Sequence, residues 1–304
     1  MNMDYKRTVL EINMTERLNR ATILDNTADV PFIRYSFFEN MDFMSAGFSV
    51  RQGGVSSGCY SGMNLSFGRG DDDENVHENF RRLGAAAGFT PEELVLPHQL
   101  HTTNVRKVTA SERGCGIIFP RPEEAVDGQV TDEPGVVLIA YGADCVPVYF
   151  CDPVRKAVGI CHAGWRGSLN DIPGETVALM ESAYGCRRSD IFALIGPSIC
   201  RDCYETGPEV AEAFTERFGH DAERERLILK KAENSDRFYL DLWEVNRLNL
   251  LDAGILSGHI GISGYCTKCH HDMLFSHRYH GDARGTNAGF IFIKNKVTET
   301  GKDA

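Results

Sequence analysis

The chain has 304 residues, of which 42% are hydrophobic and 25% charged, and this is an ordinary globular composition. It excludes a disordered or fibrous protein, and the length allows one large domain or two small ones. Lys and Arg number 32 against 43 Asp and Glu, so the net charge is −11. This acidic balance argues against binding of a nucleic-acid polymer, because a phosphate backbone requires a basic surface.

The first twenty residues show no targeting signal. They mix charged and isolated apolar residues and lack the apolar core of roughly 7–15 residues that a secretory signal has. No stretch approaches the roughly 20 apolar residues of a membrane helix. We therefore expect a cytoplasmic protein with no membrane partner. Its ten cysteines are then reduced, and a cysteine cluster there indicates metal binding or catalysis rather than disulfides.

We divide the chain into an N-terminal extension, residues 1–30, and one domain, residues 31–304. In chain order, apolar runs predict strands at 48–50, 136–140, 146–151, 157–161, 191–195, 260–262 and 290–293. Pro147 predicts either that it is among the first residues of its strand or that this strand lies at a sheet edge.

Helix signals fall between these runs. Thr90, Pro91 and Glu93 predict a helix start with a capping pattern, and residues 174–183 predict a helix. Another helix is predicted from Asp241 to the glycine at 254. Strands and helices interleave without a regular βαβ rhythm, which predicts an α/β (α+β) sandwich with mixed sheets flanked by helices.

A dispersed set of histidines and one cysteine is the first candidate for chemistry: His98, His101, Cys145 and His162. Each follows or ends a strand-like run, where a rigid element aims side chains into a shared cleft. Two imidazoles and one thiolate can bind zinc and leave a fourth position open, as in catalytic zinc sites. Two alternatives stay open: Cys145 as a nucleophile paired with His162 or His101, or a core cysteine beside satisfied histidines.

Two Cys-x-x-Cys pairs form a second candidate, Cys200 with Cys203 and Cys266 with Cys269. Such pairs are typical of structural zinc sites, but 62 residues separate Cys203 from Cys266, whereas the usual gap is about 15–20. His270 and His271 are further possible ligands, and the alternative is that four reduced cysteines merely fall three apart. We expect the other five cysteines to be reduced packing residues: Cys59, Cys115, Cys151, Cys161 and Cys186.

Arginines next to glycines indicate an anion site. They are Arg51, Arg166, Arg278 and Arg284. Guanidinium groups suit phosphate, and glycines let backbone N–H groups approach it. The local field of a cleft can differ in sign from the whole protein, so the net charge does not forbid a small anionic substrate. The chain has neither a Walker A pattern nor a GxGxxG motif, which disfavours a nucleotide-cofactor fold.

Several ordered motifs run from about Phe48 to Ile293. They include Arg51-Gln52-Gly53-Gly54, Gln99-Leu100-His101, Asp127-Gly128-Gln129-Val130, Ala143-Asp144-Cys145-Val146-Pro147, His162-Ala163-Gly164-Trp165-Arg166-Gly167 and Ile195-Gly196-Pro197-Ser198. In these motifs the chain resembles the laccase-domain family, also described as YfiH-like or multicopper polyphenol oxidase proteins. The resemblance implies a zinc-dependent purine nucleoside phosphorylase with adenosine deaminase side activity. The implied substrates are phosphate and adenosine, inosine, guanosine or S-methyl-5'-thioadenosine.

The resemblance also implies roles for individual residues. The zinc ligands are His101, Cys145 and His162, with His98 as a spare. The implied catalytic residues are Cys145, Asp127 and Arg51, and the implied substrate-binding residues are Asn64, Gln99 and Arg278. Arg51 and Arg278 are expected to contact phosphate, and Asp127 to serve as an acid/base or ribose contact. Tyr279 stands where the family more often has an arginine, which leaves Arg278 as the anion contact of that segment.

Three other functions compete with this one. The older family name suggests a copper-dependent polyphenol oxidase, with copper in place of zinc. Such oxidases need several histidine-rich sites, whereas the chain has ten histidines and no His-x-His pair. The others are a cysteine hydrolase that uses Cys145 and a non-enzymatic metal-binding interaction protein.

Overall fold

The computed structural model describes residues 23–25 and 30–295. Most of the predicted extension, residues 1–30, lies outside this part, so that domain boundary stays a prediction. Strand β1 (Ile23–Asp25) lies within it and pairs antiparallel with β2 (Phe32–Arg34). Within the described residues, no helix has the length and apolar character needed to cross a membrane.

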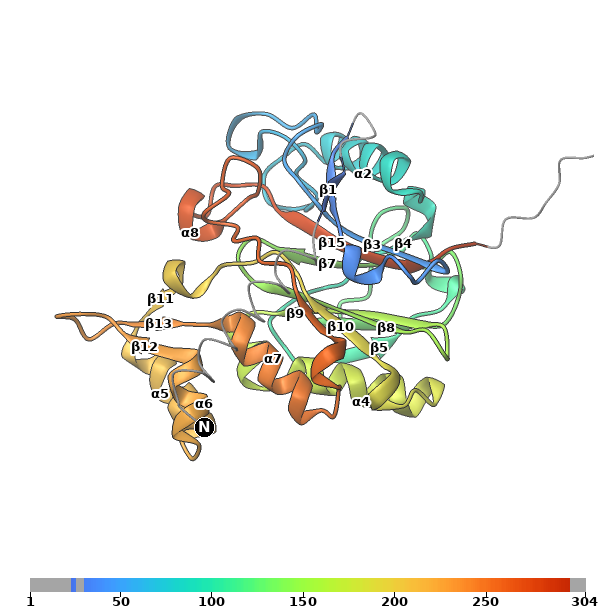
Figure 1. The fold of residues 1–304 in the computed structure, drawn as a ribbon. Coiled ribbons are helices and arrows are strands. Elements are labelled where there is room, and N and C mark those ends of the chain that lie inside the picture. The colour runs from blue at the N-terminus through green and yellow to red at the C-terminus, as the bar shows by residue number, and fades with distance from the viewer. Residues whose placement is uncertain (1–22, 26–29, 296–304) are drawn as a thin grey trace, which may run out of the picture.

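Two six-stranded sheets pack face to face (Figure 1). The first has the order β1-β2-β3-β15-β7-β4, with β3 at Met44–Ser49, β15 at Asn287–Ile293, β7 at Val137–Gly142 and β4 at Leu94–Val95. The second has the order β14-β10-β8-β9-β6-β5, with β14 at Ile260–Ile262, β10 at Phe192–Ile195, β8 at Val146–Asp152, β9 at Ala157–Ala163, β6 at Gly128–Thr131 and β5 at Val105–Lys107. Both sheets are mixed, because β4–β7, β5–β6 and β10–β14 are parallel pairs and the other pairs are antiparallel.

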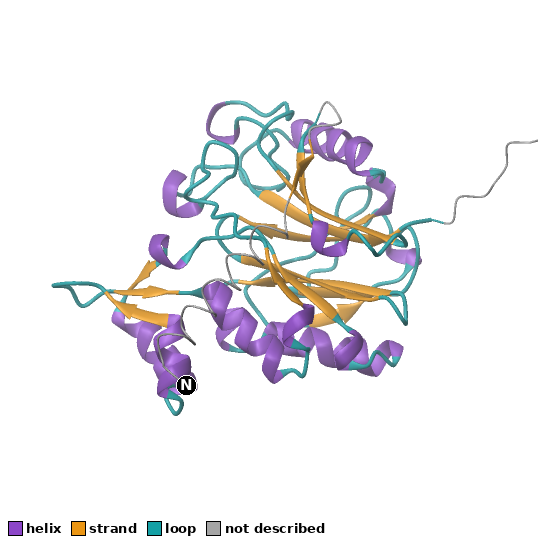
Figure 2. Ribbon diagram, in the orientation of Figure 1, coloured by secondary structure: helices purple, strands orange, loops and turns teal. Residues whose placement is uncertain are grey.

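Helices cover the outer faces of the two sheets (Figure 2). Helix α2 (Asp73–Ala87) packs on the first sheet, whereas α4 (Ile172–Tyr184) and α7 (Leu242–Asp252) pack on the second. The short helix α3 (Trp165–Leu169) follows β9. A small sheet, β11-β13-β12, lies to one side with two helices: β11 at Glu205–Thr206, β12 at Leu229–Lys231, β13 at Phe238–Leu240, α5 at Pro208–Phe218 and α6 at Ala222–Ile228.

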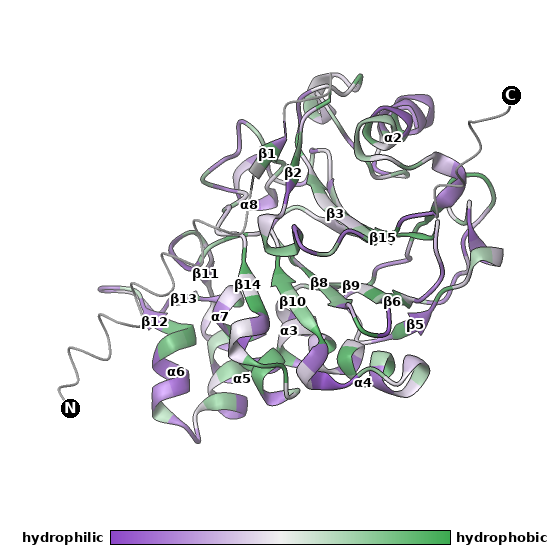
Figure 3. Cartoon of the chain, turned by 45° about the vertical axis from the view of Figure 1, so that its right-hand side comes forward, coloured by the Kyte–Doolittle hydropathy of each residue, from purple (hydrophilic) through white to green (hydrophobic). Residues whose placement is uncertain are grey.

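The central strands are buried on both faces, which explains why they read as continuous apolar runs. In β8, Tyr149 and Cys151 point between the sheets, while Val148 and Phe150 face the helices. Figure 3 shows the resulting apolar ribbon along β8, β10 and β14. The Tyr149 hydroxyl donates to the carbonyl of Gly47 in β3 at 3.0 Å, so it bridges the two sheets.

The predicted α/β sandwich with mixed sheets in one domain is confirmed. Each predicted strand is present, and both longer helices occur, with Asp171 and Asp241 as their N-caps. Pro147 is the second residue of β8, which lies inside its sheet, so the edge alternative is wrong.

The helix predicted from Thr90 is also wrong as a full helix. Its capping box is present but closes only one 3-10 turn, Pro91–Glu93. The buried residues Leu94 and Val95 then pair with β7, because an apolar run beside a sheet edge gains more from strand pairing than from helix propensity.

Candidate active site and metal centre

Three predicted ligands meet where the chain crosses from the first sheet to the second. His101 lies in the connection from β4 to β5, and Cys145 lies in the turn from β7 to β8. His162 is near the end of β9, where it pairs with Pro147 of β8. The strand register therefore brings the turn that carries Cys145 next to the end of β9.

The ligand atoms of His101, Cys145 and His162 all lie within 4.8 Å of one another. Cys145 Sγ is 3.8 Å from His101 Nε2, and the two imidazole rings are 4.8 Å apart at an interplanar angle of 75°. Tetrahedral zinc with ordinary Zn–S and Zn–N bonds separates S and N by about 3.6 Å, so this spacing fits the metal. His162 is buried, Cys145 is partly exposed and His101 is exposed, so one side of the cluster is open.

Two residues of this region adopt left-handed backbone conformations without being glycine. His101 has φ 63° and Asp144, next to Cys145, has φ 103°. Such conformations cost about 1–3 kcal/mol each and persist where the surrounding structure enforces them. At Asp144 its own carboxylate supplies this enforcement, because it accepts hydrogen bonds from Thr267 Oγ1 and from the Arg278 backbone N–H, both at 2.6 Å. At His101 the backbone N–H donates to Asp127 Oδ1 at 3.0 Å.

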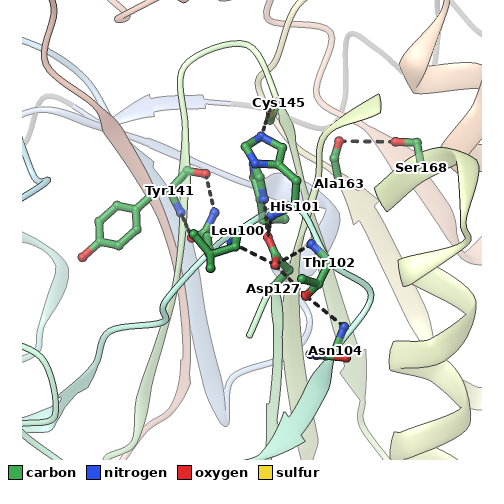
Figure 4. Close-up of polar contacts among 11 residues, drawn as sticks. Leu100, His101, Thr102, Asn104, Asp127, Tyr141, Cys145, Ala163 and Ser168 are labelled. Carbon is green, nitrogen blue, oxygen red and sulfur yellow. Dashed lines mark hydrogen bonds and ion pairs between the residues drawn. The ribbon is translucent and has the colours of Figure 1, made fainter. Parts of the chain in front are cut away.

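Asp127 lies behind the ligand cluster and is buried (Figure 4). Its Oδ1 accepts from His162 Nδ1 at 2.8 Å, which leaves His162 Nε2 for a metal. Its carboxylate also accepts backbone hydrogen bonds from Leu100, His101 and Thr102 at 2.8–3.2 Å, and one from the Thr102 hydroxyl at 2.8 Å. Asp127 therefore orients one histidine ring and fixes the loop that carries the other.

The thiolate of Cys145 and the protonated imidazole of His162 stabilise each other. Burial raises the pKa of the Cys145 thiol, but the His162 and His101 rings outweigh burial and lower this pKa to about 6. Burial lowers the pKa of His162, whereas Cys145 and Asp127 reverse that effect and raise it to about 9. The thiolate form, which is the form that ligates metal, is thus favoured at neutral pH.

The backbone of Gly164 lies against the ligands. A Cβ atom at this position would lie 2.8 Å from His101 Cδ2 and 3.1 Å from Cys145 Sγ. Both distances are below ordinary van der Waals contact, so the glycine leaves the space that the two side chains occupy.

The predicted amide contacts, Gln99 and Asn64, are bonded within the chain. Gln99 clamps the backbone of Tyr141, accepting from its N–H at 2.7 Å and donating to its carbonyl at 3.1 Å. Buried Asn64 donates to Asp71 Oδ2 at 2.8 Å and accepts from the Thr286 N–H at 3.0 Å. These bonds position loops, and the substrate contacts expected of the two residues stay predictions.

Two of the predicted arginines contact or belong to helix α8 (His277–His280). Arg278 belongs to α8, and its Nη1 donates to the Glu205 carbonyl at 2.8 Å. Arg51 Nη1 donates to the His271 carbonyl at 2.9 Å and lies 3.2 Å from His280 Nε2. Arg166, by contrast, is exposed and lies over the ring of its neighbour Trp165.

Buried Arg284 lies within electrostatic reach of the cluster. Burial lowers its pKa, and the charges of Asp144 and Cys145 act in the opposite sense. Its Nη1 donates to the Gly285 carbonyl at 3.1 Å, while its Nε has no hydrogen-bond partner among the described residues. The sequence groups Arg284 with the other arginines but gives no sign that its side chain is buried.

Tyr204 and Asp144 are the neighbours whose importance the sequence reasoning missed. Burial raises the pKa of Tyr204, and the charges of Cys145 and Asp144 raise it further. The Arg278 guanidinium lies 5.3 Å from the Tyr204 ring centroid. Asp144 stands inside the motif Ala143-Asp144-Cys145-Val146-Pro147, and Tyr204 directly follows Cys203, so these positions were the available signal.

The remaining histidine candidates lie outside the cluster. His98 Nδ1 is 2.8 Å from the Glu123 carbonyl oxygen, and the group of possible metal ligands found here contains His101 but not His98. His270 Nδ1 is 2.9 Å from the Cys266 carbonyl oxygen, and His271 stacks on Tyr279 at 3.5 Å between ring centroids.

Known proteins share this sequence pattern and architecture. Residues 45–294 match the profile of the family described as multi-copper polyphenol oxidoreductase laccase. The chain is 37% identical to purine nucleoside phosphorylase YlmD of Geobacillus stearothermophilus, over 83% of this chain and 91% of that protein. It is 33% identical to adenosine deaminase RL5 of an unknown prokaryotic organism, over 84% and 96%. The crystal structure of the Bacillus licheniformis hypothetical protein YfiH matches with a TM-score of 0.81 at 31% identity, over 89% of this chain and 99% of that chain.

Fold and site together define a two-sheet α/β protein with a His/Cys/His cluster, suited to a metal ion, at the crossover between its sheets. The family profile covers most of the chain, and the relatives keep more than 30% identity along it. The chain belongs to the multi-copper polyphenol oxidoreductase laccase family. The resemblance drawn from its motifs is thereby confirmed, as is the expectation of an enzyme, because these relatives carry enzyme names.

Proposed function

We propose that the protein is a zinc-dependent purine nucleoside phosphorylase. The observation that carries this proposal is the open cluster of His101, Cys145 and His162. The relative from Geobacillus stearothermophilus, which bears this activity in its name, supports the substrate class. The proposed substrates are adenosine, inosine, guanosine or S-methyl-5'-thioadenosine, together with inorganic phosphate.

The proposed zinc ligands are His101 Nε2, Cys145 Sγ and His162 Nε2. Mixed imidazole and thiolate ligands suit zinc, and three protein ligands leave one position for substrate or water. When bound, zinc supplies Lewis-acid polarisation of a substrate atom or lowers the pKa of a water molecule. Copper oxidase chemistry has less support, because the other ligand group among the described residues consists of cysteines alone.

The proposed reaction is phosphorolysis of the glycosidic bond. A phosphate oxygen attacks C1′ of the ribose, the C1′–N bond to the purine breaks, and the purine leaves with the bonding electrons and takes up a proton. Arg278, Arg51 and Arg284 are assigned to phosphate, since guanidinium groups hold its oxygens at the reacting carbon.

Asp127 is assigned a positioning role. Within the described residues, the hydrogen bonds of its carboxylate go to His162 and to the loop 100–102, and its side chain is buried. The acid/base or ribose contact expected of it is therefore less well supported than orientation of the two histidine ligands.

Adenosine deamination is a second candidate activity of the same site. The relative named adenosine deaminase RL5 supports it, and an open metal position suits attack of water on the purine ring. Deamination would convert adenosine to inosine and ammonia without using phosphate, so product analysis separates the two reactions.

A nucleoside panel with and without phosphate tests the proposal. We expect free purine base and ribose 1-phosphate only when phosphate is present, with inosine from adenosine as a minor product. Release of base without phosphate would indicate a hydrolase instead. Oxygen uptake on phenols with stoichiometric copper, and no nucleoside turnover, would establish the oxidase.

A further inference from the structure

The four cysteines of the two Cys-x-x-Cys pairs come together despite their separation in sequence. Cys200 and Cys203 follow β10, whereas Cys266 and Cys269 follow β14. Strands β10 and β14 are adjacent and parallel, so the segments after them emerge at the same edge of the sheet. A bridge between Ser198 and Cys266 continues this pairing up to the cysteines. The adjacency of β10 and β14 therefore brings the two cysteine pairs together, although 62 residues separate Cys203 from Cys266 in the sequence.

The sulfur atoms have the spacing of a metal site. All four Sγ atoms lie within 4.8 Å of one another, and Cys203 Sγ is 3.5 Å from Cys269 Sγ. Four sulfurs on tetrahedral zinc lie about 3.8 Å apart, given Zn–S bonds of about 2.3 Å. A disulfide requires about 2.05 Å between sulfurs, and the four cysteines are free.

Backbone donors point at the most buried of these sulfurs. The N–H groups of Cys200 and Cys269 donate to Cys266 Sγ at 3.3 and 3.4 Å. Hydrogen bonds of this kind stabilise a thiolate more than a neutral thiol, because the acceptor is charged. Lys268, inside the second pair, adds positive charge beside the negative charge that a four-thiolate zinc centre carries, whereas Arg201, inside the first pair, is offset by Asp202 at 3.8 Å.

We propose that Cys200, Cys203, Cys266 and Cys269 bind a second, structural zinc ion. Four thiolates in a tetrahedral arrangement complete the coordination shell and leave no position for substrate. The nearby histidines are engaged elsewhere, so the ligand set is cysteine alone.

This zinc ion joins the two segments that shape the substrate side of the His/Cys/His cluster. Thr267, inside the second pair, donates from its hydroxyl to Asp144, the neighbour of Cys145. Arg278, a few residues after that pair, bonds to the carbonyl of Glu205, which lies just after the first pair. The second zinc thus links the two cysteine-bearing segments whose neighbours, Thr267 and Glu205, hold Asp144 and Arg278 in place.

Metal counting on the full chain, purified without added chelator, tests the proposal. We expect about two zinc ions per wild-type chain and about one in Cys203→Ser or Cys269→Ser, since each site holds one ion. Cys59→Ser, a change at an exposed cysteine outside both groups, should keep about two. One zinc per wild-type chain, with the four thiols free to react, would overturn the proposal, as would a Cys203–Cys269 disulfide in the chain as purified, without added oxidant.

X-ray absorption keeps the proposal testable if the serine variants do not fold. The Cys145→Ala chain lacks a ligand of the other site, so its remaining zinc should show four sulfurs at about 2.3 Å and no nitrogen. Nitrogen or oxygen ligands in that spectrum, or no zinc at all, would contradict the four-cysteine site. Neither measurement uses nucleoside turnover. The count of two rests on the proposed zinc at the His/Cys/His cluster, whereas the loss of one ion in the serine variants and the spectrum of Cys145→Ala report on the four-cysteine site alone.

Discussion

Asp127 holds His162 through two hydrogen bonds. The His162 backbone N–H donates to the Asp127 carbonyl at 2.7 Å, and His162 Nδ1 lies 2.8 Å from Asp127 Oδ1. The first bond fixes the position of the residue at the end of β9, and the second fixes the ring with Nε2 toward Cys145. A carboxylate behind a ligating histidine is the usual way in which proteins orient such a ring.

Asp127→Asn should weaken zinc binding by about 10–100-fold, the usual effect of removing such a partner. The amide replaces one carboxylate oxygen by a donor, which then faces the backbone N–H groups of His101 and Thr102 or the His162 ring. Competition with a chromogenic chelator measures the affinity. Glu124→Gln, at an exposed carboxylate nearby, is the control and should bind zinc like the wild type. Unchanged affinity in Asp127→Asn would refute the positioning role.

Cys145→Ala should abolish both nucleoside turnover and metal binding at the His/Cys/His cluster. The thiolate is one of three ligands there, and two histidines alone hold zinc weakly. Cys59→Ser should leave both unchanged. If Cys145→Ala lost turnover but kept full metal occupancy, Cys145 would be a nucleophile instead of a ligand.

Gly164→Ala should lower zinc affinity, by about tenfold or more, through steric displacement of His101 and Cys145. The added Cβ would lie 2.8 Å from His101 Cδ2, while φ −66° at Gly164 suits alanine. Gly258→Ala is a matched control, because a Cβ there meets nothing within 4 Å. Calorimetric titration of metal-free protein gives both affinities, and equal values for the two variants would contradict the crowding of the site.

Tyr149→Phe should lower the free energy of unfolding by about 1–3 kcal/mol, because it leaves a buried acceptor and a buried hydroxyl without their partner. The Tyr149 hydroxyl donates to the Gly47 carbonyl at 3.0 Å and accepts from the Tyr35 hydroxyl at 3.0 Å, both between the sheets. Urea unfolding measures the change. Tyr279→Phe, at an exposed tyrosine whose ring stacking is kept, should have no comparable effect. A loss below about 0.5 kcal/mol would show that water replaces these bonds.

Seven strands were predictable because burial on both faces leaves a strong apolar signal, whereas partly exposed strands such as β5, β12 and β13 were missed. Runs such as 146–151 and 157–161 extend in the structure by only one or two residues. The helix α2 was missed, since its sequence is polar on the exposed face and begins with acidic residues that read as a loop. Thr90 shows the limit of local signals, because its capping box is present although strand pairing ends the helix at once.

The grouping of His101, Cys145 and His162 was predictable from residue type and motif, but the surroundings of these three residues were not. Nothing local in the sequence reveals that Asp144 adopts φ 103° or that its carboxylate reaches Thr267 and the N–H of Arg278. For the four-cysteine group, the sequence was misleading for the same reason, because it does not show which strands are neighbours. Linear spacing argued against it, yet the adjacency of β10 and β14 brings Cys203 and Cys269 together.

The most direct test of the proposed phosphorolysis measures whether phosphate is incorporated into the sugar product. The zinc-loaded wild-type chain is incubated with inosine and inorganic phosphate, and phosphorus NMR and chromatography quantify ribose 1-phosphate and hypoxanthine. We expect equal amounts of the two products, no hypoxanthine without phosphate, and neither product from Cys145→Ala. Hypoxanthine formed without ribose 1-phosphate, or equal turnover by Cys145→Ala, would contradict the proposal.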